Sequence, residues 1–500
     1  MKGENAMKYL FFYDESEHSR KITQKTVNAS NFALDFVAAV IGYTKSSSEK
    51  IENDYSVIEE KYRKVFCVDE LKSTIITKKK YKNGFASFNK NDIDLIEDII
   101  DFCLSKNLKI YVTIQNKIHY LIVQILNNYH TSFFFDADAM SYSVTKLICM
   151  YKPQEVIDAI YKKDISFVVE LKKFCLELLA HNGNAIHKGS ENELLKQLLI
   201  LLEKSNSSLE VDWQYENSFY GFKKYLIEQS ISDYELLIDK EGNGTTNRAA
   251  QIAGINSQEA DSKNYVGIRI ADFIAGLVSR FIIAIQNDIS YADIEDNKNL
   301  KYLNDKWFDI DERRFELYKK LRYLIVNQNN SWDKLCCSLY ADEATYLISL
   351  LNYIANYKSY NDFIECTMHK EYVNTCAVND LKRHFELMSN KLSIDPISIE
   401  DDTYINQKGA VCYKDFNKHK YLLIDDKERT YQVLSVGFFG KMEKACVTIR
   451  ENGGPVVYLL PNSLLKWAVT CVAIANRGGN LFPSTVRFIK RDGRDCADIL

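Results

Sequence analysis

The stretch KYLFFYDESEHS, residues 8–19, decides how this chain is interpreted. It runs from a cluster of aromatic and aliphatic side chains directly into two adjacent carboxylates, Asp14 and Glu15. The apolar part is typical of a central β-strand. A strand that stops at a solvated turn would explain the two carboxylates. A strand that delivers a carboxylate to a metal site would explain them equally, so the rest of the chain must decide.

The segments that follow this strand predict an α/β sheet. Residues 29–44, ASNFALDFVAAVIGYT, form a second apolar element, either a strand or a helix. Residues 89–107 carry apolar residues at helical spacing, with Asn91 or Asp92 as the cap. Residues 108–117, LKIYVTIQNK, predict a strong strand. This order of strand, extended segment, helix and strand belongs to a mixed α/β sheet.

The length of 500 residues predicts two or three domains. Residues 1–295 form one α/β domain with a mostly helical insertion at about 138–230, and the polar segment SYADIEDNKNLKY, residues 290–302, marks its end. Residues 296–400 have the pattern of a helical region. Residues 401–500 are β-rich with one expected helix, which indicates a small α+β domain.

Composition and charge are those of a soluble globular protein, with 46% apolar and 26% charged residues. The formal net charge is −4, so a surface that binds nucleic acid must be a local basic patch. We expect no signal peptide, and no membrane span because no run approaches ~18 consecutive apolar residues. The 12 cysteines form no CxxC or zinc-type spacing, which favours free core thiols in a cytoplasmic protein over a disulfide framework.

Four acidic residues stand at the boundaries of expected buried elements. Each has a local explanation: Asp272 can cap its helix, Asp239 can belong to a turn, and Glu70 can be a surface acid. Taken together, their order and settings are more informative than any one of them. They are Asp14 at the end of YLFFYD, Glu70 in CVDELKST, Asp239 at the end of YELLID and Asp272 in IRIADFIAG.

Carboxylates in such positions suit hard divalent cations. Mg²⁺ and Mn²⁺ prefer oxygen ligands and keep several of their waters. Cleavage of a phosphodiester by two such ions needs carboxylates that bridge metals about 3.5–4 Å apart. One ion activates the attacking water, and the other stabilises the leaving oxygen. Strand ends and helix starts hold such ligands more rigidly than loops do.

The chain resembles one family through four motifs: FFYDESEHS, DELKST, LLIDKEGN and DSKNYVGIRIADFIAGLVSR. The family is catalogued as domain of unknown function 3800, and its members are similar to ribonuclease H-type folds. The resemblance spans roughly residues 8–285, and its most specific part is the pairing of the first motif with the last. Glu17 stands where the family usually has glycine, and the helical insertion is larger than in a minimal member.

The resemblance implies a ribonuclease H-like mixed sheet with Asp14 on its first, central strand. Asp239 would end a neighbouring strand, and Asp272 would open the last helix. Asp14 would then be the ligand that bridges two Mg²⁺ or Mn²⁺ ions. Glu70, Asp239 and Asp272 would complete the shell. Two further acids could substitute for these ligands: Glu15 and Glu241.

Lysines near these acids are candidates for guiding nucleic acid. By the same resemblance, Lys72 and Lys263 could contact phosphate, although each is more simply explained as a solvated lysine. The segment TKKKYKNGFASF, residues 77–88, interleaves lysines with Tyr81 and Phe85, which suits a phosphate backbone and stacked bases. A solvated charge run is the alternative. The lysines of this segment are Lys78, Lys79, Lys80 and Lys82.

Other motifs give weaker or negative signals. The absence of GxxxxGK[ST] and of GxSxG speaks against a P-loop NTPase and an α/β-hydrolase. His181 and His187 lie in AHNGNAIHKGS, where polar surface is one interpretation and a second metal site the other. Cys336 and Cys337 are expected in the core on opposite sides of a helix. Residues 486–495, VRFIKRDGRD, predict a basic hairpin that is a second candidate for nucleic-acid binding.

These observations predict a metal-dependent nuclease that hydrolyses phosphodiester bonds of RNA or DNA. The resemblance suggests a bacterial anti-phage defence effector as its context. A non-catalytic module of the same fold, which binds nucleic acid or a protein, is the main alternative. A scaffold or homo-oligomer that docks through residues 300–500 is a third.

Overall fold

The protein is described from a computed structural model, in which the chain forms two compact units. The first contains the N-terminal strands and extends to Ser389, and the second runs from Asn390 to Leu500. The structure describes residues 8–17, 33–126, 137–162, 165–183, 185–202, 216–240, 244–291, 301–392, 404–405, 419–439, 444–451, 454–465, 467–468, 470–471, 481–491 and 493–500. Most of the expected boundary at 290–302 therefore lies outside the described residues.

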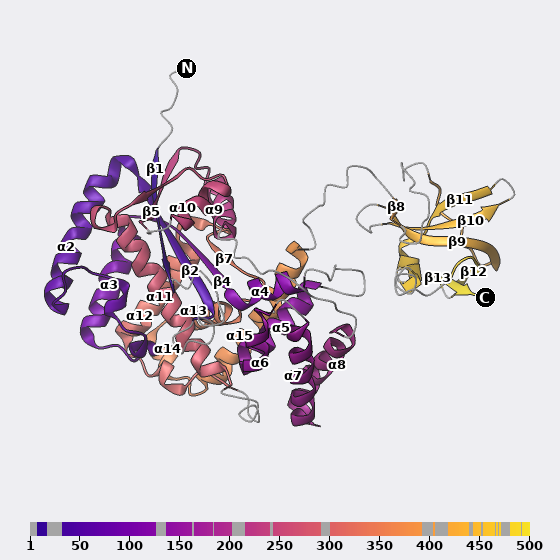
Figure 1. Ribbon diagram of the computed structural model, residues 1–500, viewed down its shortest axis with the longest axis horizontal. Helices are drawn as coiled ribbons and strands as arrows, with labels where there is room; N and C mark the ends of the chain where they lie inside the picture. Colours follow the sequence, from indigo (N-terminus) through magenta and orange to yellow (C-terminus); the bar gives the residue numbers. More distant parts are fainter. Residues whose placement is uncertain are drawn as a thin grey trace, which may run out of the picture. The chain divides into compact units, whose positions relative to one another are not determined.

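A six-stranded mixed sheet forms the centre of the first unit (Figure 1). Its strands are β1 (Tyr9–Ser16), β2 (Asp35–Thr44), β4 (Lys109–Asn116), β5 (Tyr234–Asp239), β6 (Ser257–Ala260) and β7 (Leu335–Cys337). Their order is β6-β5-β1-β2-β4-β7. β2 is antiparallel to β1 and β4, whereas β5 is parallel to β1, β6 to β5 and β7 to β4. The predicted mixed α/β sheet is confirmed, and the segment that we expected as strand or helix is strand β2.

Both faces of the central strands are buried, which explains why their sequences are apolar without alternation. Side chains alternate between two cores on opposite faces of the sheet. Phe12 and Ala39 belong to the first core, and Phe11 and Ala38 belong to the second. The helices that cover each face can therefore be assigned from these clusters.

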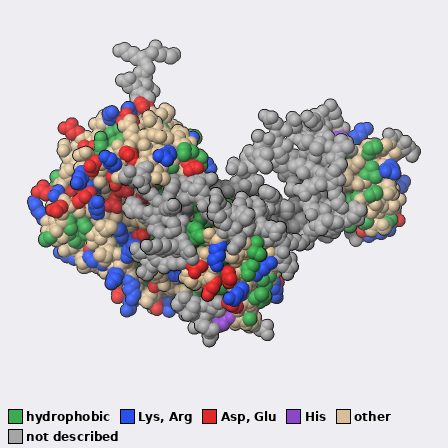
Figure 2. All heavy atoms as spheres, in the orientation of Figure 1, with side chains coloured by type: hydrophobic (Ala, Val, Ile, Leu, Met, Phe, Trp, Pro, Cys, Tyr) green, Lys and Arg blue, Asp and Glu red, His purple; other side chains and the backbone are tan. Residues whose placement is uncertain are grey.

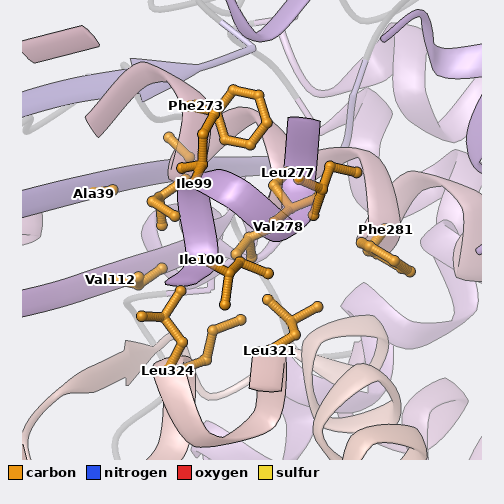
Figure 3. Packing of buried hydrophobic residues seen from close by; sticks show 14 of the residues in the cluster. Ala39, Ile99, Ile100, Val112, Phe273, Leu277, Val278, Phe281, Leu321 and Leu324 are labelled. Atoms are coloured by element: carbon orange, nitrogen blue, oxygen red, sulfur yellow. The ribbon is translucent and has the colours of Figure 1, made fainter. Parts of the chain in front are cut away.

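The larger core lies under helices from distant parts of the sequence. These are α2 (Ser48–Phe66), α3 (Lys90–Ser105), α11 (Val266–Ile289), α12 (Glu312–Arg322) and α13 (Asp342–Ala355). Figure 3 shows Ile100 of α3, Val278 of α11 and Leu321 of α12 meeting over Ala39 and Val112 of the sheet. Almost every side chain of α11 is buried, as its apolar sequence predicts.

The opposite face of the sheet is covered by α9 (Asn217–Glu228) and α10 (Thr245–Ile252). Phe222 of α9 packs edge-on against Phe11, with 5.2 Å between the ring centroids. The segment expected as a helical insertion contains α9 and the helices before it. These are α5 (Ala137–Tyr151), α6 (Gln154–Ala159), α7 (Ser166–Asn182) and α8 (Gly189–Leu202), whereas α4 (Lys117–Ile125) lies between β4 and the expected segment.

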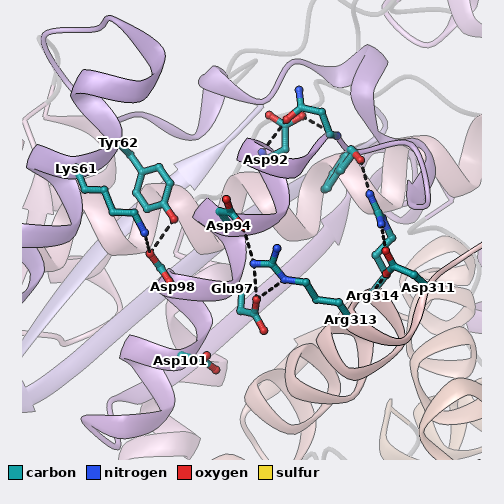
Figure 4. Close-up of polar contacts among 12 residues, drawn as sticks. Lys61, Tyr62, Asp92, Asp94, Glu97, Asp98, Asp101, Asp311, Arg313 and Arg314 are labelled. Atoms are coloured by element: carbon teal, nitrogen blue, oxygen red, sulfur yellow. Dashed lines mark hydrogen bonds and ion pairs between the residues drawn. The ribbon is translucent and has the colours of Figure 1, made fainter. Parts of the chain in front are cut away.

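The helical region after α11 belongs to the same compact unit as the sheet. Figure 4 shows the ion pairs between α12 and α3: the Arg313 guanidinium lies 2.6 Å from the Asp94 carboxylate and 2.7 Å from the Glu97 carboxylate. Such partly exposed pairs contribute about 0–1 kcal/mol each. The apolar contacts of Leu321 beneath them therefore contribute most of the attachment.

The same region also extends the sheet through β7. Cys336 and Cys337 pair with Thr113 and Ile114 of β4, so the expectation that these cysteines lie on a helix is wrong. The short apolar run LCC becomes a strand because it finds an unpaired edge of β4. The chain continues through α13, α14 (Tyr360–Ile364) and α15 (His369–Leu392).

The N-terminus of α3 differs from the expected one by two or three residues. Its cap is Asn89, whose side chain accepts a hydrogen bond from the backbone N–H of Asp92. The Asp92 carboxylate accepts one from the Asn89 N–H in return. Asp92 thus closes a capping box instead of serving as the cap itself, and Asn91 has neither role.

The second unit is built on an antiparallel sheet with the order β11-β10-β9-β12-β13, and β8 also pairs with β9. Its strands are β8 (Tyr404–Ile405), β9 (Arg429–Phe439), β10 (Lys444–Glu451), β11 (Gly454–Leu459), β12 (Ser484–Arg491) and β13 (Arg494–Ile499). Its own core includes Val433, Val447 and Phe488. The predicted hairpin is confirmed as β12–β13, and Tyr421 forms an isolated bridge with Leu459 of β11.

The 11 described cysteines are all free, which agrees with the expectation of unpaired thiols. Cys103, Cys149 and Cys175 are among the buried ones, and Cys412 lies outside the described residues. Within the described ranges, no helix is both long enough and apolar enough to cross a membrane.

Candidate carboxylate site at the end of the mixed sheet

Asp14 and Asp239 lie side by side at one end of the sheet. The parallel pairing of β1 with β5 sets Tyr13 opposite Ile238, and the two acids are the next residues along these strands. Neighbouring strands are about 4.8 Å apart. Because side chains alternate, both carboxylates project from the face that carries Phe12, which is the face that α11 covers.

α11 runs in the same direction as β1. Near its start, Gly267 lies against Phe12 so closely that an added Cβ would be 2.2 Å from the ring. Further along the helix, Phe281 packs against Tyr81 of the short 3-10 helix η3 (Lys78–Tyr81), with 5.5 Å between the ring centroids. Lys78, the first residue of η3, forms an ion pair at 2.7 Å with Glu17, the residue just beyond β1. The later turns of α11 therefore lie toward the end of the sheet that carries Asp14.

Asp272 is level with Asp14 along this direction. It lies five residues after Gly267 on the helix, an advance of about 7.5 Å. Asp14 lies two residues after Phe12 on the strand, an advance of about 6.6 Å. Asp14, Asp239 and Asp272 thus lie at similar levels on three separate elements, but Asp272 is turned about 140° round α11 from the side on which Gly267 faces β1, toward Ser73.

Both carboxylate oxygens of Asp272 are held by Ser73. The Ser73 N–H donates to Oδ2 at 2.8 Å, and the Ser73 hydroxyl donates to Oδ1 at 2.7 Å. Asp272 is the seventh residue of α11, and the residue at the cap position, Tyr265, makes no side-chain cap bond. The interpretation of Asp272 as a helix cap is therefore wrong. Its side chain instead ties the loop that contains Ser73 to the helix.

Glu70 lies on the same loop, in irregular structure before Ser73. Its carboxylate is 3.5 Å from the ammonium group of Lys72. A buried ion pair joins the neighbouring elements: the Arg269 guanidinium bonds both oxygens of Glu59, at 2.6 and 2.8 Å. Burial lowers the pKa of Arg269, but the Glu59 carboxylate and the nearby charge of Glu70 raise it by more, so that this pKa lies above its ordinary value. Glu70 is thus a neighbour of the other acids and is already partly compensated by cations.

Asp239 combines burial with local compensation. Burial raises the pKa of Asp239 above its ordinary value, and hydrogen bonds from the backbone of Lys240 and from Ser262 oppose that rise. The Lys72 charge also opposes it. The bond from the Lys240 N–H, at 3.0 Å, is of the kind found in turns, so this part of the turn interpretation holds.

Asp14 and Glu15 point to opposite faces of the sheet. Asp14 is buried, and its Oδ1 accepts a hydrogen bond from the Glu15 N–H at 2.6 Å. The Glu15 carboxylate accepts one from the Tyr13 hydroxyl at 3.0 Å, on the face covered by α9. Glu15 therefore cannot substitute for Asp14 as a ligand. Glu241, the other proposed substitute, lies outside the described residues.

The candidate ligands suit a hard divalent cation by their chemistry, because all are carboxylate oxygens. The oxygens of Asp14 and Asp272 accept hydrogen bonds from the protein, yet a carboxylate has about four acceptor positions. In the part of the chain that the structure describes, no group of three or more His, Cys, Asp or Glu side chains could hold a metal ion as arranged. Asp14 and Asp239 end neighbouring strands, and Asp272 lies on the helix that covers the same face, but the described acids do not form a group that could hold an ion.

The basic segment at residues 77–88 has a different role from the one expected for its aromatic residues. Tyr81 and Phe85 are buried in the core, where they pack edge-on against Phe281. They cannot stack on nucleic-acid bases. Lys78 is paired with Glu17, and Lys80 is paired at 2.8 Å with the buried Asp92. The segment is thus largely a structural connection between the end of β1, α3 and α11.

Five of the six proposed phosphate-binding lysines are exposed, and only Lys80 is half-buried; the exposed ones are Lys72, Lys78, Lys79, Lys82 and Lys263. Lys72 has 57% of its side chain accessible. On the face drawn in Figure 2, basic and acidic side chains are interspersed over the first unit instead of gathering into a basic patch. On this face, any guidance of nucleic acid would come from separate lysines and not from a continuous basic patch.

Two other candidates gain no support. In the hairpin β12–β13, Arg487 is paired with Glu428 and Asp498, and Arg491 is also paired with Asp498. Much of the basic charge of the hairpin is therefore neutralised within the second unit. His181 ends α7, and His187 is exposed on a 3-10 turn. Neither histidine belongs to a described group that could hold a metal.

Sequence inspection missed the residues that support the acids. Ser73 has no signal in ELKST that separates it from an ordinary loop serine. Arg280 had one: it is a charged residue in the otherwise apolar run GLVSRFIIA, eight positions after Asp272 on the same helix. A charge at that position is buried at a cost and therefore indicates a polar partner.

We compared the chain with known proteins, and no family model, no curated protein and no solved structure matches it.

Proposed function

We propose that this protein is a divalent-metal-dependent nuclease with its active site at the end of the mixed sheet. Asp14, Asp239 and Asp272 would be its principal metal ligands, and Glu70 would complete the set. The proposal is supported by the carboxylates Asp14 and Asp239 at the adjacent ends of β1 and β5, and by Asp272 on α11, the helix that covers the same face of the sheet. Such a concentration of buried or half-buried acid is unfavourable unless cations sit among the carboxylates.

The strand order supports a ribonuclease H-like fold, which the family resemblance implies. Such a fold requires a central first strand, an antiparallel second strand beside it and a parallel strand on its other side. β1, β2 and β5 have these relations. It also requires an acid at the end of the parallel strand and another on a helix that packs over the sheet, positions that Asp239 and Asp272 would occupy.

The residues divide into ligands, supports and phosphate contacts. Bound Mg²⁺ or Mn²⁺ would activate the attacking water and stabilise the leaving oxygen of the phosphodiester. Asp14 and Asp239 are fixed by strand pairing, which limits the rearrangement needed on binding. The exposed Lys72, whose charge acts on Asp239, and the exposed Lys263, next to Ser262, would attract the phosphates of RNA or DNA. A role in bacterial defence against phage, implied by the resemblance, belongs to the same proposal.

The decisive experiment is cleavage of labelled single- and double-stranded RNA and DNA with Mg²⁺, with Mn²⁺ and with EDTA. We expect metal-dependent cleavage that Asp14→Asn and Asp272→Asn each reduce by about 100-fold or more, because loss of even an outer-shell partner costs about 10–100-fold. Glu15→Gln is the matched control: Glu15 adjoins Asp14 but faces the other side of the sheet. Equal losses in Asp14→Asn and Glu15→Gln would contradict the assignment of Asp14.

A non-catalytic module is the second candidate, and one observation favours it. No group of three potential ligands is closed around a metal position in the described parts of the chain. This candidate predicts that the protein retains nucleic acid in a gel-shift assay without cleaving it, whichever metal is added. It also predicts that Asp14→Asn leaves that binding intact, since removal of a negative charge does not weaken attraction for phosphate.

A further inference from the structure

The most unusual charge near the site is Arg280, which is only 5% exposed on α11. Its Nη2 donates to the hydroxyl of Ser73 at 3.3 Å, and it also hydrogen-bonds to Tyr81. Its Nη1 is buried and has no hydrogen-bond partner in the described part of the chain. A buried guanidinium with an unused donor is costly and needs a compensating interaction. The positive charge of Arg280 therefore needs an acidic partner, and the acid bound to the other side of Ser73 is Asp272.

The position of this guanidinium depends on Gly276, one turn earlier on the helix. A Cβ at Gly276 would lie 2.5 Å from Arg280 Nη1 and 2.4 Å from Ser73 Cβ. Only a residue without a side chain leaves this space. The Arg280 side chain uses it to fold back along α11 toward the turn that carries Asp272, and Ser73 occupies the gap between them.

These contacts form one continuous line of hydrogen bonds. Arg280 donates to the Ser73 hydroxyl, and that hydroxyl donates to Asp272 Oδ1. A cation that donates to a hydroxyl makes the hydroxyl a stronger donor, because hydrogen bonds in a chain polarise one another. The Ser73 N–H fixes the other oxygen of Asp272. The carboxylate is held at both oxygens, and each still has an acceptor position for a cation.

We propose that Arg280, Ser73 and Gly276 form a positioning unit that holds the Asp272 carboxylate ready for a divalent metal, an inference that rests on the proposed function. Arg280 and Ser73 are positioning residues, since neither would touch substrate or metal. Hydrogen-bond partners of a metal ligand typically contribute about 10–100-fold to metal affinity. A purely structural role, in which the contacts only anchor the loop to α11, would leave metal affinity unchanged.

The test is Mn²⁺ affinity of the full chain, measured by EPR of free Mn²⁺, for five proteins. Ser73→Ala removes the hydroxyl, and Arg280→Met removes the charge with little loss of volume. We expect both to weaken Mn²⁺ binding by about 10–100-fold and Arg280→Lys to restore part of it. Ser279→Ala is the control, because Ser279 is also a buried serine, next to Arg280 on α11. It should bind Mn²⁺ like the wild type.

The outcomes separate this inference from the function on which it rests. A wild type that binds no Mn²⁺ overturns the proposed metal site and the positioning unit with it. A wild type that binds Mn²⁺ while Ser73→Ala and Arg280→Met bind it equally well overturns the positioning unit alone. Circular dichroism verifies folding, and if Arg280→Met fails to fold, Ser73→Ala still decides, since it deletes only one oxygen atom.

Discussion

A second set of buried acids, outside the candidate site, shows how single residues balance charge in this protein. Asp35 begins β2 and accepts a hydrogen bond from Asn116 at 3.2 Å. Asp342 begins α13 and pairs with Lys146 of α5 at 2.8 Å. The next residue, Glu343, is 4% exposed, and its Oε2 has no hydrogen-bond partner among the described residues. Burial, followed by the charges of Asp35 and Asp342, raises the pKa of Glu343 well above its ordinary value.

This arrangement predicts a pH-dependent stability that Asp35 controls. Burial raises the pKa of Asp35 to about 6; the Asn116 bond and the Lys117 charge lower it, and the Asp342 charge raises it. The ordinary value is about 3.9, so the folded state binds this proton more tightly than the unfolded state. The contribution of Asp35 to stability is therefore lost as pH rises from about 4 to about 6.

Asp35→Asn removes this titration. Relative to the wild type, its free energy of unfolding should increase by about 2 kcal/mol between pH 4 and pH 7, at 1.36 kcal/mol per pKa unit. Urea denaturation at a series of pH values measures the difference. Parallel pH profiles for the two proteins would show that Asp35 is ionised in the folded state throughout, contrary to this argument.

At the scale of elements, the close approach of α11 to β1 positions the candidate site. Gly267 permits it, since a Cβ would lie 2.2 Å from the buried ring of Phe12. The resulting contact sets the level of Asp272 relative to Asp14. A helix held further from the strand would separate the acids.

Gly267→Ala should therefore destabilise the first unit by about 1–3 kcal/mol, the usual cost of overpacking a core. Gly189→Ala is the matched control, because an added Cβ there meets no atom within 4 Å and alanine is a better helix former. Thermal unfolding followed by circular dichroism compares the two variants. The argument fails if Gly267→Ala is as stable as the wild type.

At the scale of the whole molecule, the chain forms two units with separate cores. The mixed sheet and all four candidate acids belong to the first unit, and the antiparallel sheet has its own cluster around Val447 and Phe488. The helical region before Ser389 packs on the sheet and contributes β7, so it belongs to the first unit.

Truncation after Leu392, the end of α15, should therefore leave the first unit folded. We expect residues 1–392 to retain the Mn²⁺ affinity and the metal-dependent cleavage of the full chain, because no candidate ligand is removed. Titration calorimetry and the cleavage assay check this expectation. Loss of cleavage with unchanged metal affinity would assign residues 393–500 to substrate binding instead.

Local sequence patterns predicted the secondary structure of a segment better than they predicted which other segments it packs against. The apolar runs of β1 and β4 and the helical spacing of α3 and α11 were recognised, because periodicity reports directly on burial. The β7 segment was assigned to a helix, since its strand state depends on an open edge of β4 more than 200 residues earlier. The stacking role of Tyr81 and Phe85 failed because aromatic composition does not distinguish a core from a nucleic-acid surface.

By itself, the sequence determined that carboxylates terminate buried elements at Asp14, Asp239 and Asp272, because the change from apolar to acidic residues is a local feature of the chain. Only the tertiary structure decided that Asp14 and Asp239 share one face while Glu15 faces the other, and that Ser73 and Arg280 support Asp272. Strand register and helix direction decide such neighbours. Both arise from packing between segments far apart in sequence, which a local pattern does not encode.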